Sequence, residues 1–74
     1  MPMNTTILVI DDEVPIRKLL GSVLGGAGYH IVSGASVAEA RAILAQQEID
    51  LLITDIIMPE ETGYDLIDHV KKNH

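Results

Sequence analysis

Three short apolar runs divide the chain, and each is followed by a stretch in which apolar residues recur at a different spacing. The runs lie within residues 7–10, 29–32 and 50–55. Apolar runs of this length, rich in β-branched residues, are typical of strands, so we predict a strand at each, and we expect the first and third to be buried on both faces of the sheet. The first and third predicted strands end in carboxylates, at Asp11-Asp12 and at Asp55.

Helical spacing follows the first two predicted strands. Apolar residues recur at helical intervals over residues 16–24, and the glycines within residues 25–28 can take the left-handed conformation that ends many helices. Ser36 and Glu39 have the spacing of a capping box, in which the serine accepts the amide three residues on while the glutamate reaches back. The helix that they begin is predicted to run to about Gln46.

A third helix is predicted after the third strand. Pro59 and Gly63 mark a loop before this helix. The helix is predicted over residues 64–72, with Leu66, Ile67 and Val70 on its inward face. Strands that alternate with helices imply a parallel sheet with right-handed crossovers. The pattern therefore predicts an α/β fold of three strand–helix units.

Composition and charge indicate which classes of protein the chain can belong to. The chain has 74 residues, enough for one domain, and 47% of them are hydrophobic against 22% charged, which indicates a folded protein. Eleven acidic residues against five basic ones give a net charge of -6, so we expect no direct nucleic-acid binding. Cysteine is absent, and neither a signal peptide nor an apolar run of membrane-spanning length is present, so we expect a cytoplasmic protein that does not enter a membrane.

The carboxylates at the strand ends are the candidate chemistry. Ligands of open parallel sheets bind beyond the carboxyl ends of the strands. If the first and third strands are neighbours, Asp11, Asp12 and Asp55 meet there, and two carboxylates about 4 Å apart repel by roughly 4 kcal/mol at an effective dielectric of 20. Oxygen ligands of this kind favour Mg²⁺, and a carboxylate beside Mg²⁺ can act as a nucleophile toward phosphorus.

Other interpretations of these residues remain open at this point. Acidic residues after a strand are also common as helix caps, so Asp11, Asp12 and Glu13 taken alone do not distinguish a metal site from a cap. A phosphatase of the haloacid-dehalogenase type also uses a strand-end aspartate with Mg²⁺. Its motif, however, needs a second aspartate two residues on, where this chain has Ile57. A non-signalling fragment that self-assembles through an exposed sheet edge is a further alternative.

Two segments resemble the receiver domains of two-component response regulators. Residues 7–13, Ile-Leu-Val-Ile-Asp-Asp-Glu, are similar to the first strand and acidic pair of that family. From Asp55 to Gly63 the chain reproduces the family's phosphoacceptor loop, in which Asp, two residues, Met-Pro, three residues and Gly follow in order. The resemblance extends over the whole chain.

The resemblance implies a fold and a role for particular residues. The fold would be a flavodoxin-like parallel sheet with strand order 2-1-3. Asp55 would accept a phosphoryl group from a sensor histidine kinase, as one step of a phosphorelay. Asp12 and Asp55 would bind Mg²⁺ directly, Asp11 mostly through water, and Ile57 through its backbone carbonyl. Such a module is a phosphoprotein that signals, and beyond Mg²⁺-dependent self-phosphorylation and dephosphorylation we expect no enzymatic activity.

The chain ends before the full length of the domains that it resembles. Those domains continue through a fourth and a fifth strand, which carry a switch Ser or Thr and a phosphate-pairing Lys. Because this chain ends at His74, we expect residues 1–74 to be a receiver domain that lacks both strands, so that its phosphorylation site is incomplete. The third strand would then lie at the sheet edge, and we expect the chain to form a homo-oligomer through it.

Overall fold

The computed structural model describes residues 5–55 and 62–73, which form three strands and three helices in strict alternation. In chain order these elements are β1 (Thr6–Ile10), α1 (Val14–Gly26), β2 (His30–Gly34), α2 (Val37–Gln46), β3 (Leu51–Thr54) and α3 (Gly63–Asn73). All of the predicted elements are present. No helix in the described ranges is long and apolar enough to cross a membrane.

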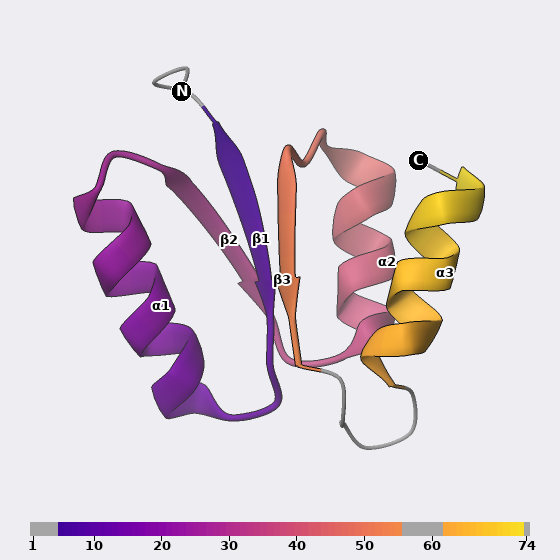
Figure 1. Cartoon of the computed structure of the whole chain (residues 1–74), viewed down its shortest axis with the longest axis horizontal. Helices are drawn as coiled ribbons and strands as arrows, with labels where there is room; N and C mark the ends of the chain where they lie inside the picture. The colour runs from indigo at the N-terminus through magenta and orange to yellow at the C-terminus, as the bar shows by residue number, and fades with distance from the viewer. Residues whose placement is uncertain (1–4, 56–61, 74) are drawn as a thin grey trace.

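The three strands form a parallel sheet with β1 in the centre. The strand order is β2-β1-β3, which confirms the predicted order 2-1-3. In register, Ile10 lies opposite Gly34 of β2 and Thr54 of β3, so all three strands end at the same edge. Helix α1 covers one face of this sheet, while α2 and α3 lie side by side on the other (Figure 1).

The core is built around β1, whose buried residues pack on both faces of the sheet. Ile7, Leu8, Val9 and Ile10 are at most 2% exposed, as the uninterrupted apolar run predicts. Side chains alternate between the faces of a strand. One face contributes to the main core cluster, which consists of Leu8, Ile10, Val37, Ala40, Leu44 and Leu66. The helices α2 and α3 therefore hold the sheet from one side through a shared core.

Local hydrogen bonds explain where the helices begin and end. The amide of Glu39 donates to Ser36 Oγ at 3.2 Å, as the predicted capping box requires. The glutamate carboxylate reaches one residue further back than expected, to the Ala35 amide at 2.9 Å. At the end of α1, Gly28 has a φ of 101°, a conformation that glycine adopts without a steric cost.

The second strand lies one to two residues later in the chain than predicted. Tyr29 was expected to begin it, but its amide donates to the Leu24 carbonyl and so belongs to the end of α1. At the other end the strand continues to Gly34, which pairs with Ile10. The bond from the Tyr29 amide places the start of the strand later in the chain, and the pairing of Gly34 with Ile10 places its end later as well.

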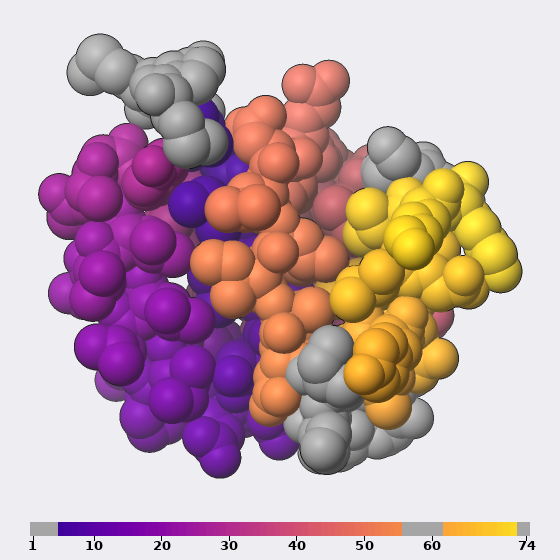
Figure 2. Space-filling model, in the orientation of Figure 1, coloured from indigo at the N-terminus to yellow at the C-terminus, as the bar shows by residue number. Residues whose placement is uncertain are grey.

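Apolar side chains also lie on the surface, around α1 and β3. Leu19 and Val23 of α1 are 58% and 60% exposed, although they share the helical spacing of the half-buried Leu20 and Leu24. The prediction that the third strand is buried on both faces is wrong at Leu51, which is 47% exposed, and within the described residues β3 pairs with β1 alone. Figure 2 shows β3 uncovered between α1 and α3 on the face toward the viewer. The predicted position of the third strand at a sheet edge is therefore confirmed for this part of the chain.

Candidate functional site

Two backbone hydrogen bonds position the candidate site at the carboxyl edge of the sheet. The amide of Asp55 donates to the Ile10 carbonyl at 3.0 Å, which places the residue after β3 beside the end of β1. The amide of Asp11 donates to the Gly34 carbonyl at 3.2 Å, which ties the end of β1 to β2. Asp11 and Asp55 are therefore positioned by the same ladder that forms the sheet.

The carboxylates of Asp11, Asp12 and Asp55 come together at this edge. Each of the three offers one oxygen, and these oxygens all lie within 4.8 Å of one another. Three negative charges at this spacing repel one another, and a divalent cation between them would relieve that repulsion. Carboxylate oxygens are the ligands that Mg²⁺ prefers, so the donor set fits the ion that the sequence predicts. Asp12 is exposed, which would leave room for water around a bound ion.

The alternative interpretation of these residues as helix caps is not supported. The N-cap position of α1 is Glu13, and its side chain makes no capping hydrogen bond. The first turn of α1 contains no acidic residue. Asp11 Oδ1 accepts the Glu13 amide at 2.9 Å, a local bond that orders the loop and still leaves the second oxygen of this carboxylate. Capping therefore does not account for the acidic pair.

The cluster does not include Asp50, the acidic residue that precedes β3. Ile57, expected to offer its carbonyl to the metal, lies outside the described residues. Asp50 lies at the opposite end of β3, where its carboxylate accepts the Thr6 amide at 2.8 Å and its amide donates to the Thr6 carbonyl. Asp50 therefore joins the start of β3 to the start of β1, which is a structural role.

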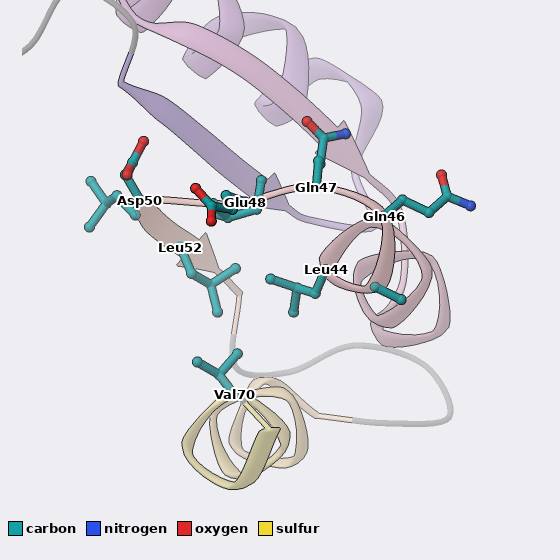
Figure 3. A pocket seen from close by; sticks show the side chains of 10 residues that line it. Leu44, Gln46, Gln47, Glu48, Asp50, Leu52 and Val70 are labelled. Carbon is teal, nitrogen blue, oxygen red and sulfur yellow. The ribbon is translucent and has the colours of Figure 1, made fainter.

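A groove of about 700 Å³ lies near the amino-terminal edge of the sheet, away from the carboxylate cluster. The end of α2, the start of β3 and Val70 of α3 line it, with Leu44 and Leu52 among its apolar walls (Figure 3). Glu48 and Asp50 contribute acidic groups to its rim. The groove contains none of the three clustered aspartates.

Two contacts near the site were not predicted from the sequence. Arg17 donates from Nη1 to the carbonyl oxygen of Asp11 at 2.7 Å. Thr62 and Asp65 form a reciprocal cap at the start of α3, in which the Thr62 amide donates to Asp65 Oδ2 at 2.8 Å and the Asp65 amide donates to Thr62 Oγ1 at 3.3 Å. The second contact has a visible signal, the Thr-x-x-Asp spacing of a capping box. The Arg17 contact has no such signal in the sequence, because it joins a side chain to a backbone carbonyl.

The comparisons with known proteins agree with this geometry. A family model described as the response regulator receiver domain matches residues 7–74. The transcriptional regulator NtrC of Bradyrhizobium, described as DNA-binding, is 40% identical over 72 residues, which are 97% of this chain and 15% of NtrC. The chain thus spans about one seventh of that regulator.

Solved structures match at the level of the fold. Chemotaxis response regulator CheY4 of Vibrio cholerae has a TM-score of 0.91 at 30% identity, with 95% of this chain and 58% of CheY4 covered. Response regulator TrrA of Thermotoga maritima, solved in complex with Mg²⁺ and BeF, has a TM-score of 0.88 at 37% identity, with 92% and 59% covered. TrrA has also been solved in complex with the histidine kinase ThkA, and that match has a TM-score of 0.89 at 36% identity, with 95% and 60% covered. The resemblance seen in the sequence is confirmed, and the chain belongs to the response regulator receiver domain family.

Proposed function

We propose that this chain is the phosphoacceptor part of a two-component phosphorelay, in which Asp55 receives a phosphoryl group from a histidine kinase. The observation that carries the proposal is the cluster of Asp11, Asp12 and Asp55, whose oxygens lie within 4.8 Å of one another at the carboxyl edge of the sheet. Membership of the receiver family supports it. The complex of the similar regulator TrrA with a histidine kinase supports the choice of partner.

The proposed reaction moves a phosphoryl group from nitrogen to oxygen. A carboxylate oxygen of Asp55 attacks the phosphorus of a phosphohistidine, so that an O–P bond forms while the P–N bond breaks. The electron pair of the broken bond stays on the imidazole nitrogen, which then takes a proton from water. Asp55 is the proposed nucleophile because it alone of the three follows β3 and begins the loop that resembles the family's phosphoacceptor loop.

Mg²⁺ is the proposed cofactor of this step. Asp12 and Asp55 would hold it directly and Asp11 mostly through water, and the Ile57 carbonyl is proposed as a further ligand. When bound, Mg²⁺ would offset the negative charge of the carboxylates and of the incoming phosphoryl oxygens. The Mg²⁺ in the TrrA structure supports this choice. The role is that of a signalling module, and we propose no conversion of a separate substrate.

Phosphoramidate provides a direct test, because its P–N bond matches that of phosphohistidine. Intact-mass spectrometry should show one added phosphoryl group on the wild-type chain in Mg²⁺ and none after chelation. Asp55→Asn should lose the addition, since the amide replaces the nucleophilic oxygen while roughly keeping the shape. Asp50→Asn removes the same charge at the other edge of the sheet and should still be phosphorylated. Equal incorporation by Asp55→Asn and the wild type would contradict the proposal.

A second candidate role is self-assembly through the edge of the sheet. The observation that favours it is Leu51, which is 47% exposed on β3, a strand that pairs with β1 alone among the described residues. An open edge with exposed apolar side chains favours pairing with another chain. This role does not use the carboxylate cluster, so the two candidates are tested separately.

A further inference from the structure

Arg17 lies one turn into α1 and reaches back to the loop that carries two of the clustered carboxylates. Its guanidinium Nη1 donates a hydrogen bond of 2.7 Å to the carbonyl oxygen of Asp11, in a partly buried contact. Helical side chains lean toward the amino-terminal end of their helix, which explains how Arg17 meets the preceding loop. The bond therefore connects the body of α1 to the end of β1.

The stability of α1 does not explain a cation at this position. The amino-terminal end of a helix has a partial positive charge and favours acidic side chains. The first turn of α1 has no acidic residue, and Arg17 adds a positive charge close to this end. Its favourable interaction is the charge-assisted bond to the Asp11 carbonyl.

Asp11 is held by three hydrogen bonds from three different segments. Its amide donates to the Gly34 carbonyl of β2, its Oδ1 accepts the Glu13 amide, and its carbonyl accepts from Arg17. The Arg17 bond goes to the backbone and so takes up no carboxylate oxygen of the cluster. Arg17 can therefore fix the loop without competing with a metal for its ligands.

We propose that Arg17 is a positioning residue for the metal site, which keeps the carboxylates of Asp11 and Asp12 beside that of Asp55. This inference rests on the proposed function and adds a residue to that site. Removal of a group that orients metal ligands typically weakens metal binding by about 10- to 100-fold. We expect the loss of Arg17 to weaken Mg²⁺ binding by about tenfold.

The direction of the change in Mg²⁺ affinity distinguishes a positioning role of Arg17 from an effect of its charge. A guanidinium close to a cation repels it, so removal of the Arg17 charge alone would strengthen Mg²⁺ binding. Loss of the bond to Asp11 would weaken Mg²⁺ binding, because the loop carrying Asp11 and Asp12 would be less ordered. A weaker affinity in the variant can therefore not come from the lost charge.

The test is the Mg²⁺ dissociation constant of the 74-residue chain, measured by calorimetric titration alongside the melting temperature. Arg17→Met should raise Kd by about tenfold. Lys18→Met is the matched control, because Lys18 is the exposed neighbour on α1 and its loss changes the net charge equally. This control should keep Kd within about threefold of the wild type. Arg17→Lys keeps the charge and a donor group but loses the planar guanidinium, and should give an intermediate Kd.

The outcomes distinguish this inference from the proposed function. A Kd for Arg17→Met equal to or tighter than that of Lys18→Met would overturn the positioning role while Mg²⁺ binding by the wild type stands. If Arg17→Met does not fold, Arg17→Gln takes its place, with the same expected and contradicting values. A wild-type chain that binds no Mg²⁺, or an Asp12→Asn variant with unchanged Kd, would overturn both the metal site and the role of Arg17.

Discussion

Asp11 and Asp12 differ in how strongly the fold depends on them. Asp11 is held by bonds at its amide, its carbonyl and one carboxylate oxygen, whereas the side chain of Asp12 is exposed. Of these two residues, Asp12 can therefore be changed with the smaller disturbance of the loop. Its substitution isolates the contribution of one carboxylate to metal binding.

We predict that Mg²⁺ raises the melting temperature of the wild-type chain. A ligand at a hundred times its Kd stabilises the folded state by about 2.7 kcal/mol, and 1 kcal/mol shifts the melting temperature of a domain of this size by about 4–8 °C. Asp12→Asn should lose more than half of this rise. Thermal unfolding monitored by circular dichroism, with and without Mg²⁺, measures the difference.

The control for this prediction is Asp50→Asn, the same chemical change at the opposite end of β3. The Asp50 carboxylate accepts the Thr6 amide with a negative charge, whereas an asparagine oxygen would accept it without one, so this variant should melt at a lower temperature than the wild type without Mg²⁺. It should nevertheless show the full Mg²⁺-dependent rise. An equal rise in Asp12→Asn would mean that the ion binds elsewhere.

The site residues could be predicted to different degrees, for physical reasons. Asp11, Asp12 and Asp55 were predictable because parallel strands bring their carboxyl ends to one edge, so that residues 43 or more positions apart in the sequence meet there. Arg17 was not singled out, because a side chain that binds a carbonyl leaves no repeated spacing. The role of Ile57 stays a prediction.

Gly34 joins β2 to the site and to α2. It is buried, and its carbonyl accepts the Asp11 amide. A Cβ added there would lie 3.1 Å from Ile10 Cδ1 and 3.2 Å from Glu39 Cβ, closer than ordinary van der Waals contact. The absence of a side chain at this position thus allows β1, β2 and α2 to meet.

We therefore predict that Gly34→Ala lowers the free energy of unfolding by about 1–3 kcal/mol, because the core next to β1 would be overpacked. Urea denaturation of the variant and the wild type measures the difference. Gly21→Ala is the control, since a Cβ at Gly21 has no heavy atom within 4 Å. Alanine also favours helix over glycine, so this control should be neutral or stabilising. Equal stability of Gly34→Ala and the wild type would show that the neighbouring side chains adjust without cost.

The type and order of the strands and helices could be predicted from the sequence more reliably than the exposure of their side chains or the bounds of β2. The buried run of β1 and the cap at Ser36 are local signals, and both are confirmed. The exposure of Leu19 and Val23 was not apparent, because helical spacing identifies an apolar stripe without showing how much of it the sheet covers. The bounds of β2 depended on its pairing with β1, which is a contact between distant residues.

The edge that β3 forms among the described residues leads to a prediction about association. Leu51 is the exposed apolar residue of β3, whereas Leu52 packs against the core, so Leu51 is the position to change. We expect the 74-residue chain to self-associate at micromolar concentration, and Leu51→Lys to shift it toward monomer. Burial of one leucine side chain contributes about 1.5–3 kcal/mol, which corresponds to about a 10- to 100-fold weaker association.

Sedimentation velocity over a range of concentrations measures this shift. Val23→Lys is the matched control, because Val23 is 60% exposed on α1 and does not lie on β3. The control should associate as the wild type does. A wild-type chain that sediments as a monomer at all concentrations would contradict association through β3.

The charge of the molecule bears on its partners. The net charge of -6 is unfavourable for contact with phosphate backbones, so the absence of direct nucleic-acid binding by this chain stays a prediction. The DNA-binding described for NtrC belongs to a protein of which the chain spans 15%. The partner proposed from the carboxylate cluster is a phosphohistidine donor.

The most direct test of the account is to locate the phosphoryl group on the chain. After reaction with phosphoramidate in Mg²⁺, borohydride reduction converts an aspartyl phosphate to homoserine, which tandem mass spectrometry can assign to a position. We predict homoserine at position 55 alone, and its loss when Mg²⁺ is chelated. Homoserine at Asp11 or Asp12, or no conversion at Asp55 in a folded chain with Mg²⁺ present, would contradict the assignment of Asp55 as the phosphoacceptor.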